Sequence, residues 1–109
     1  MLTLFDVTNM FTTYVLYSEK YNKIYVGYTS SLEERVKSHN IFAKTGYTVK
    51  FRPWIVIYTE CYDSKQEAMK REKELKTLRG RDFIRNLIKA EKYLGTYPSA
   101  DGHWFKFSQ

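Results

Sequence analysis

One carboxylate, Glu72, occurs where the sequence predicts the buried side of a helix. The spacing of Ser64 and Glu67 is that of a capping box, which predicts a helix that begins there and reaches about Arg79. Glu72 projects from the middle of its apolar side, which consists of Ala68, Met69, Leu75 and Leu78. A buried carboxylate costs several kcal/mol unless it is paired. Glu72 therefore needs a metal ion, an arginine or several hydrogen-bond donors. A salt bridge to Arg35 is the structural alternative, and a carboxylate that holds a hard cation such as Mg²⁺ is the functional one.

A basic pair, Arg35 and His39, shares one face of a second predicted helix. This helix spans residues 32–40 and begins at a capping box formed by Ser31 and Glu34. Arg35 and His39 fall at helical spacing with two apolar residues, Leu32 and Val36. Both side chains are therefore expected to point inward or along the edge of a cleft. A structural alternative remains open for each residue, because an arginine stem also covers apolar surface and a histidine near a helix C-terminus also favours the helix dipole.

Two short strands precede this helix and carry tyrosines in their interiors. Residues 12–17 and 24–28 are rich in β-branched and aromatic side chains, and the short polar stretch between them suits a hairpin loop. Alternation places the side chains of the first strand on two faces, with Tyr14 and Leu16 on one and Val15 and Tyr17 on the other.

The second of these strands holds Tyr25 and ends near Gly27. A glycine at this point predicts either a close approach of another group to the backbone or a β-bulge. A third strand is predicted at residues 54–58, where a continuous apolar run indicates a central strand that is buried on both faces.

Two sets of cations are candidates for contacts with a phosphate backbone, although either set could simply be solvated. Residues 41–52 show no periodicity and are predicted to be a loop, which carries Lys44, Lys50 and Arg52. Gly80 is predicted to stop the Glu72 helix, and a further helix is expected over residues 82–90. Its basic stripe consists of Arg81, Arg85 and Lys89, and its core-facing residues are Phe83, Leu87 and Ile88.

The composition predicts a single folded domain with an anionic partner. The chain has 109 residues, of which 43% are hydrophobic and 17% aromatic, as in globular proteins. A formal net charge of +6 favours a polyanion, because lysine and arginine displace counterions from phosphates. No apolar run approaches the length that spans a bilayer, and the first residues lack a secretory signal, so no membrane association and a cytoplasmic location are expected. The single cysteine, Cys61, is predicted to be a buried structural thiol.

The two ends of the chain differ in character from the part between them. Residues 1–10 show no sustained period and are interpreted as an N-terminal extension. Residues 91–109 place aromatic side chains among Gly, Pro and Ser, and we expect a C-terminal tail that docks onto the domain or stacks on unpaired bases. The predicted domain is therefore residues 11–90.

The ordered series of motifs in that domain resembles the GIY-YIG nuclease superfamily. The resemblance is to its small stand-alone bacterial members, which are similar to the nuclease domain of the excision-repair incision subunit. It rests on Tyr14, Tyr25-Val26-Gly27, Arg35, His39-Asn40, Arg52-Pro53-Trp54 and the run from Ala68 to Lys76 that contains Glu72.

The resemblance implies a mixed α/β (α+β) fold, in which a small three-stranded antiparallel sheet is flanked by about three helices. It implies an endonuclease that hydrolyses phosphodiester bonds in DNA, in repair or recombination, with one divalent ion, Mg²⁺ or Mn²⁺. The implied catalytic residues are Tyr14, Tyr25, Arg35, His39 and Glu72, with Glu72 as the metal ligand. RNA remains an alternative substrate, and we expect a monomer that a protein partner could target.

The chain departs from the family pattern at two positions. The first motif is Thr12-Thr13-Tyr14 in place of Gly-Ile-Tyr, which keeps the tyrosine, and the asparagine that closes the motif set has only Asn86 as a candidate. Two rival interpretations are a catalytically silent nucleic-acid-binding module of the same fold, and a buried polar network that only stabilises a small core.

Overall fold

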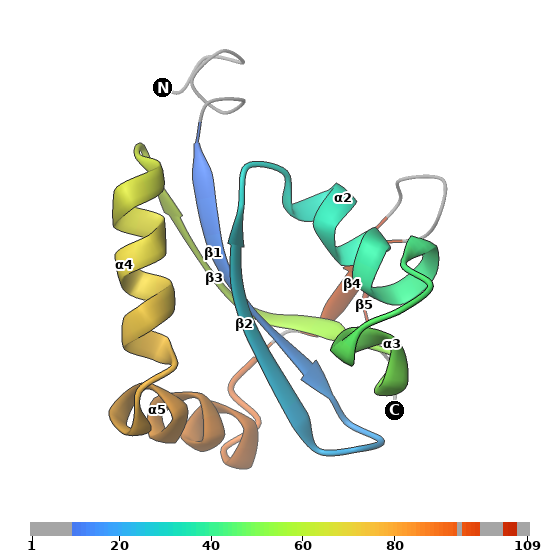
Figure 1. Cartoon of the computed structure of the whole chain (residues 1–109). Coiled ribbons are helices and arrows are strands. Elements are labelled where there is room, and N and C mark those ends of the chain that lie inside the picture. Colours follow the sequence, from blue (N-terminus) through green and yellow to red (C-terminus); the bar gives the residue numbers. More distant parts are fainter. Residues whose placement is uncertain (1–9, 94, 99–103, 107–109) are drawn as a thin grey trace.

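The computed structural model describes residues 10–93, 95–98 and 104–106, and these form an antiparallel sheet with helices on both faces (Figure 1). The strand order is β2-β1-β3-β4-β5. The strands are β1 (Phe11–Ser18), β2 (Lys23–Thr29), β3 (Ile55–Tyr62), β4 (Thr96–Pro98) and β5 (Trp104–Lys106). The helices are α2 (Leu32–Lys37), the π-helical turn η1 (Ser38–Phe42), α3 (Tyr47–Lys50), α4 (Lys65–Leu75) and α5 (Leu78–Lys89). The predicted mixed α/β class with an antiparallel sheet is confirmed.

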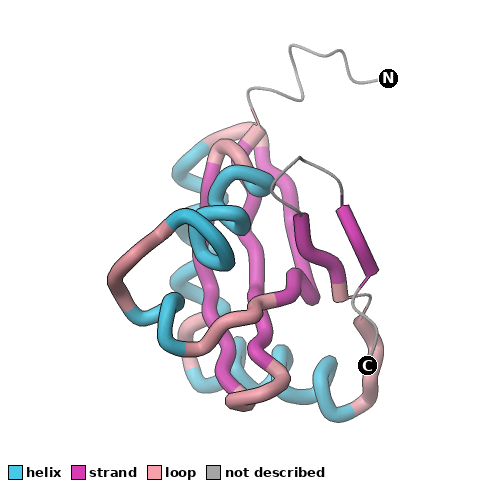
Figure 2. Tube along the Cα trace, turned by 90° about the vertical axis from the view of Figure 1, so that its right-hand side faces the viewer, coloured by secondary structure: helices cyan, strands magenta, loops and turns pink. Residues whose placement is uncertain are grey.

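The predicted sheet of three strands is extended by two short strands from the C-terminal tail. β4 pairs with β3 through Val56 and Thr96, and β5 pairs with β4. Figure 2 shows the two short strands side by side, at the end of the sheet away from β2. Residues 1–9 of the predicted N-terminal extension lie outside the described residues, as do parts of the tail.

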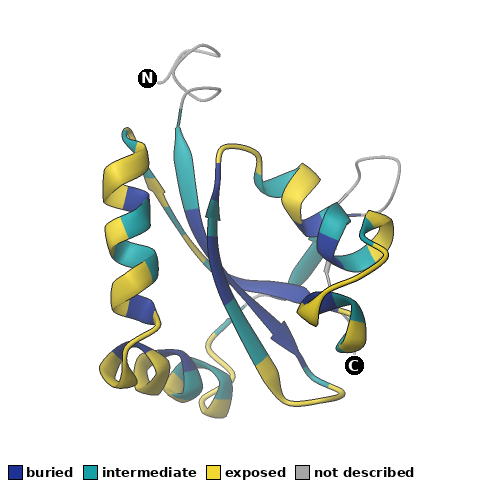
Figure 3. Cartoon of the chain, viewed as in Figure 1, coloured by how far each residue is buried: buried dark blue, intermediate teal, exposed yellow. Residues whose placement is uncertain are grey.

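Two hydrophobic clusters lie on opposite faces of the sheet. Val15 and Tyr17 of β1 pack with Leu75 and Ile84, which come from α4 and α5. The other cluster contains Tyr14 and Leu16 of β1, Val36 of α2, Trp54 and Val56. The predicted alternation of β1 is thus confirmed, and Figure 3 shows the buried strands between the two groups of helices.

The third predicted strand is the middle strand of the sheet, and residues 54–57 are buried as expected. β3 continues to Tyr62, however, and its far end alternates between half-buried and exposed positions. Cys61 lies at an exposed position of this end, so the prediction of a buried thiol is wrong. The reason is that the strand runs on past the layer that covers its first half.

The start of α2 differs from the predicted capping box. Ser31 makes no side-chain cap bond; instead the Thr29 hydroxyl donates to the Ser31 carbonyl and accepts from the Ser31 amide, at 3.2 and 3.1 Å. The predicted helix 32–40 is present as α2 followed by η1. The region predicted as a loop contains the last turn of η1 and the short helix α3, so that prediction is wrong in part.

The junction of α4 and α5 overturns the predicted role of Gly80. The Ser64 hydroxyl accepts from the Glu67 amide at 3.2 Å, as predicted, but α4 ends at Leu75. Thr77 then caps α5, and Gly80 is buried inside that helix. A Cβ atom at Gly80 would lie 2.3 Å from the Glu74 carbonyl oxygen, so glycine lets α5 cross close to the end of α4.

The side of α5 that enters the core differs in part from the predicted one: Ile88 packs against the core cluster as expected. Ile84 is fully buried, whereas Phe83, which was predicted to face the core, is 38% exposed. No helix in the described part of the chain has the length and apolar character needed to cross a membrane.

Candidate active site

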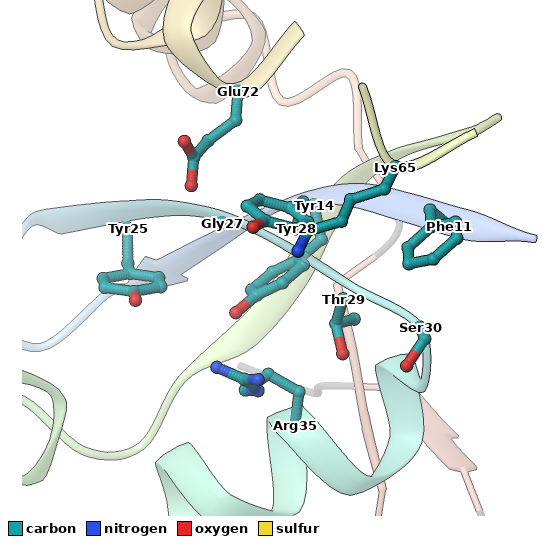
Figure 4. Close-up of a pocket in the computed structure, with 10 residues that line it drawn as sticks. All are labelled: Phe11, Tyr14, Tyr25, Gly27, Tyr28, Thr29, Ser30, Arg35, Lys65 and Glu72. Carbon is teal, nitrogen blue, oxygen red and sulfur yellow. The ribbon is translucent and has the colours of Figure 1, made fainter. Parts of the chain in front are cut away.

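A pocket of about 470 Å³ lies along the edge strand β2, between α2 and α4. Figure 4 shows Glu72 and Lys65 reaching it from α4 and Arg35 from α2, with the tyrosines between them. Its lining residues are Phe11, Tyr14, Tyr25, Gly27, Tyr28, Thr29, Ser30, Arg35, Lys65 and Glu72. Four of the five predicted catalytic residues therefore line one pocket.

Tyr14 is almost fully buried because its ring lies against the backbone of β2. Its partner in the strand register is Gly27. A Cβ atom at Gly27 would lie 2.6 Å from the Tyr14 hydroxyl oxygen, so any larger residue would displace the ring. The prediction that Gly27 permits a close approach is confirmed, and the group that approaches is the Tyr14 phenol.

The fifth predicted residue, His39, is joined to the pocket by a hydrogen bond to Tyr14. The distance from the Tyr14 hydroxyl to His39 Nε2 is 3.0 Å, and His39 Nδ1 lies 3.0 Å from the Thr48 hydroxyl. The ring of Tyr25 lies 4.8 Å from the His39 ring, between centroids. Thr48 belongs to α3, in the region predicted as a loop, and no signal in the sequence identified it.

The π-helical turn that carries His39 is held by Arg52 and Asn40. Arg52 donates hydrogen bonds to the carbonyl groups of Ser38, His39 and Ala43, at 3.2, 2.6 and 2.6 Å. Asn40 bonds both the amide and the carbonyl of Trp54, each at 2.7 Å. Arg52, a predicted phosphate contact, is thus engaged with backbone carbonyls that fix the position of His39.

Burial sets the protonation states of the hydrogen-bonded pair. It lowers the pKa of His39 from 6.5 to about 4, with further lowering by the charges of Arg35 and Arg52. Burial also raises the pKa of Tyr14 well above its ordinary value, with smaller effects from Tyr25, Arg35 and Glu72. At neutral pH the pair is therefore a phenol beside a neutral imidazole, and Nε2 can accept the phenol proton when Nδ1 carries the ring proton.

Glu72 forms an ion pair with Lys76, whereas the predicted salt-bridge partner was Arg35. Its carboxylate lies 3.4 Å from the ammonium nitrogen of Lys76, one turn later on α4, and its side chain is 17% exposed. The alternative of a salt bridge to Arg35 is wrong: within the described residues, the Arg35 side chain makes no hydrogen bond or ion pair. Arg35 faces the pocket with its guanidinium uncommitted.

The donor set around Glu72 fits a magnesium-type ion that takes most of its ligands from outside the protein. Among the described residues, no group of three or more His, Cys, Asp or Glu could hold a metal ion. Mg²⁺, however, is commonly bound by one or two carboxylates, several waters and substrate phosphates. A single carboxylate on the wall of an open pocket matches that pattern.

The remaining predicted nucleic-acid contacts lie outside the pocket. Lys44, Lys50, Arg81 and Lys89 are exposed, and Arg85 donates to the side chain and the carbonyl of Asn22 at 2.6 and 3.1 Å. Asn86, the candidate for the closing asparagine, is exposed and does not line the pocket. Lys65, which was not predicted as a site residue, also lines the pocket. Its position seven residues before Glu72 on one predicted helix is a signal in the sequence that places the two side chains on the same side.

The comparisons with known proteins give one matching family model and several similar proteins that carry the name UPF0213. Residues 10–86 match the model of the GIY-YIG catalytic domain. A UPF0213 protein of Staphylococcus haemolyticus is 45% identical over 58 residues, which are 53% of this chain and 71% of that protein. A UPF0213 protein of Staphylococcus saprophyticus is 41% identical over 58 residues, with the same coverage. The solution NMR structure of a UPF0213 protein from Bacillus halodurans is 29% identical, has a TM-score of 0.44, and covers 72% of this chain and 84% of its own.

The matched range contains every residue of the pocket and both partners of the Tyr14–His39 hydrogen bond. Since the family model covers well over half of the chain, this protein belongs to the GIY-YIG catalytic domain family, a family of nucleases.

Proposed function

We propose that this protein is a divalent-metal-dependent endonuclease that hydrolyses phosphodiester bonds in DNA. The observation that carries the proposal is the 3.0 Å hydrogen bond between Tyr14 and His39, in a pocket that Arg35 and Glu72 enter from opposite helices. It brings a proton acceptor, a cation and a carboxylate together. Each of these has a distinct use in the attack of water on a phosphodiester.

Proton removal from the attacking water is assigned to Tyr14 and His39 acting together. Burial raises the pKa of the Tyr14 phenol, so at neutral pH the phenol keeps its proton. Tyr14 can therefore accept a proton only if it passes its own proton on at the same time. The water proton passes to the Tyr14 oxygen as the Tyr14 proton moves to His39 Nε2. The water oxygen then bonds to phosphorus, the bond from phosphorus to the 3′ oxygen breaks, and the 3′ oxygen leaves as a hydroxyl with a proton from solvent.

Substrate binding favours the transfer of the proton to His39, because the bound phosphate offsets the positive charge of Arg35. In the free protein the Arg35 charge contributes, after burial, to the low pKa of His39. A bound phosphate pairs with the guanidinium through charge-assisted hydrogen bonds. Its negative charge offsets that of Arg35, so His39 becomes a stronger base when substrate is present. Arg35 also stabilises the charge that develops on the phosphate oxygens, and Tyr25 orients the phosphate or the water.

Glu72 would hold the divalent ion, Mg²⁺ or Mn²⁺, which supplies Lewis acidity to the phosphate and to the leaving oxygen. The ammonium group of Lys76 lies beside the same carboxylate and has to release it to the ion. Half of the Lys76 side chain is exposed, so this release needs only a rotamer change toward solvent.

The test is an incubation of the purified protein with labelled single-stranded, duplex, flapped and four-way-branched DNA, and with a matching RNA strand. Each is given Mg²⁺, Mn²⁺ or a chelator. The variant Glu72→Ala removes the metal ligand, and Glu74→Ala is its matched control, since Glu74 is an exposed carboxylate on the same helix. The flapped and branched substrates are those of repair and recombination, the role that the resemblance to the excision-repair subunit implies.

Metal-dependent cleavage that is lost in Glu72→Ala and kept in Glu74→Ala is the expected result. Binding without cleavage under every condition would instead identify a catalytically silent nucleic-acid-binding module. Neither binding nor cleavage would leave the network around Tyr14 and His39 with a structural role only, or make activity dependent on a protein partner.

A further inference from the structure

We infer that Lys65 is a substrate-binding residue of this pocket, and that its ammonium group contacts the phosphate next to the one that is cut. The inference rests on the proposed function and specifies how the nucleic-acid strand is held. Lys65 is not among the residues that the resemblance to the nuclease family assigns to the site.

Lys65 shares the pocket with the proposed catalytic residues but reaches it at another point along α4. It is the first residue of that helix, and Glu72 is the eighth. Seven residues correspond to almost two full turns, so the two side chains leave α4 on the same side. Figure 4 shows the Lys65 side chain directed from α4 toward Tyr14 and Tyr28, while Phe11 lies beside it.

Lys65 and Arg35 are the cations of the pocket wall that no other group of the described protein engages. Neither side chain has a hydrogen bond or an ion pair within the described residues. Three other cations of α2 and α4 are paired: Lys37 with Glu33 at 2.9 Å, Arg71 with Glu60 at 2.9 Å, and Lys76 with Glu72 at 3.4 Å. The unpaired lysines of α4 other than Lys65 do not line the pocket. An uncommitted lysine that faces the same pocket as an uncommitted arginine suits a ligand with more than one negative group.

Helix stability gives no reason for a lysine at this position. The first turn of a helix favours carboxylates, because the helix dipole places partial positive charge there. α4 has Glu67 in its first turn for that purpose and the Ser64 cap in front of it. A positive charge at Lys65 therefore weakens the helix slightly, and its contribution has to come from something that the ammonium group binds.

The separation of Lys65 and Glu72 along α4 indicates that they contact different phosphates of the bound strand. At a rise of 1.5 Å per residue, the backbone positions of Lys65 and Glu72 are about 10 Å apart along the helix. A phosphate that reacts beside Tyr14 and Glu72 is held by Arg35 across the pocket. The Lys65 backbone lies farther along the same wall, and its side chain reaches back toward Tyr14. Its ammonium group therefore approaches the strand from the side of the neighbouring phosphate.

The experiment compares Lys65→Gln with Lys70→Gln, which removes the same charge from an exposed position on another side of α4. Fluorescence anisotropy of labelled single-stranded and duplex DNA, in chelator and at several salt concentrations, gives the affinity and its salt dependence. Single-turnover cleavage with Mg²⁺ and the protein in excess over DNA, below and above saturation, separates the chemical step from binding and product release.

For Lys65→Gln we expect several-fold weaker binding, with the slope of log affinity against log salt reduced by about 0.7 to 0.9, the value for one phosphate contact. The rate of cleavage at subsaturating DNA should fall by the same factor as the affinity. Lys70→Gln should leave affinity, slope and turnover unchanged.

Three outcomes would overturn the inference. Equal binding by Lys65→Gln and the wild type would remove Lys65 from the contact surface and leave the proposed nuclease function intact. Lost turnover with unchanged affinity would place Lys65 at the reacting phosphate instead. Absence of DNA binding and cleavage in the wild type would reject the proposed function, and this inference with it.

Discussion

At the scale of single residues, the contact between Tyr14 and His39 is the feature with the clearest chemical consequence. Tyr14 is 1% exposed and His39 is 7% exposed, so each hydroxyl or ring nitrogen depends on the partners that the protein provides. The chain of hydrogen bonds from Tyr14 through His39 to Thr48 satisfies them. The same chain provides a route for a proton away from the pocket.

We predict that Tyr14→Phe lowers the cleavage rate by about 10² to 10⁴, which is the usual contribution of general acid–base catalysis. DNA affinity should stay within a factor of two, because Arg35 and Lys65 remain in place. Tyr17→Phe is the matched control: it removes the hydroxyl of another buried tyrosine on the opposite face of β1. Rates of cleavage, anisotropy titrations and thermal unfolding of both variants test this, and equal loss of activity in the two would contradict a catalytic role for Tyr14.

A second prediction at this scale concerns the pH dependence of stability. The pKa of His39 is lowered from 6.5 to about 4 by burial, Arg35 and Arg52. As the pH falls below 6.5, His39 becomes protonated in the unfolded chain, whereas in the folded chain it stays neutral until about pH 4. The free energy of unfolding should therefore decrease over this range, by at most about 3 kcal/mol from this group.

The measurement is denaturant unfolding at pH 7, 5.5 and 4.5 for the wild type and His39→Gln. Glutamine keeps hydrogen-bonding capacity and does not titrate, while His103 is present in both proteins. The wild type should lose more stability on acidification than the variant. Parallel pH profiles would show that His39 does not remain neutral in the folded protein.

At the scale of elements, the orientation of α4 decides whether Glu72 faces the tyrosines. Two polar contacts attach this helix to the sheet. The buried Thr13 hydroxyl donates to the Ala68 carbonyl at 2.8 Å, one turn before Glu72. At the other side, Arg71 donates to Glu60 of β3 at 2.9 Å. Thr13 occupies the central position of the first motif, so this departure from the family pattern links the strand of Tyr14 directly to the helix of Glu72.

We predict that Thr13→Val destabilises the protein by about 1 kcal/mol, the usual contribution of one hydrogen bond, although valine has nearly the same shape. Metal affinity should also fall, because α4 loses an attachment close to Glu72. Thr12→Val, at a half-buried position of the same strand, is the control, since the Thr12 hydroxyl has an exposed contact of 3.7 Å with the Cys61 sulfur in place of a buried hydrogen bond. Denaturant unfolding and Mn²⁺ titration by water-proton relaxation measure the two effects. Unchanged values for Thr13→Val would mean that packing alone positions α4.

At the scale of the whole molecule, the basic residues behind the net charge of +6 fall into two groups: some hold the fold together, and others are exposed and unpaired within the described residues. Arg52 fixes the turn around His39, and Arg85 holds the β1–β2 loop through Asn22. Arg81 and Lys89 are exposed on α5 without an ion pair among the described residues. These two cations are the members of the predicted basic stripe that remain available to a polyanion.

We predict that the double change Arg81→Gln and Lys89→Gln weakens DNA binding. The slope of log affinity against log salt should also decrease by about 1.4 to 1.8, the value for two phosphate contacts. Cleavage at saturating DNA should be unchanged, since neither residue lines the pocket. Anisotropy titrations between low and moderate salt provide the measurement. The double change Lys44→Gln and Lys50→Gln removes the same charge from the other predicted set of phosphate contacts and tests that set in the same way. An unaltered slope for the α5 pair would exclude that helix from the interface.

Local patterns in the sequence determined the elements and the faces that they present. The alternation of β1, the buried middle strand, the Ser64 cap and the inward side of α4 follow from spacing between nearby residues. Each of these features is set by the period of a helix or a strand, which a sequence displays directly. That Tyr14, Tyr25, Arg35 and Glu72 belong to one site was implied instead by the resemblance to the nuclease family, and the four residues line one pocket.

Only the tertiary structure decided which distant groups meet. It paired His39 with Tyr14 and Thr48, placed Gly80 inside α5, and left Cys61 exposed at the end of β3. These outcomes depend on how one element crosses another and on how far a covering layer extends. No local period encodes such contacts, because the partners are brought together by the packing of the whole sheet and its helices.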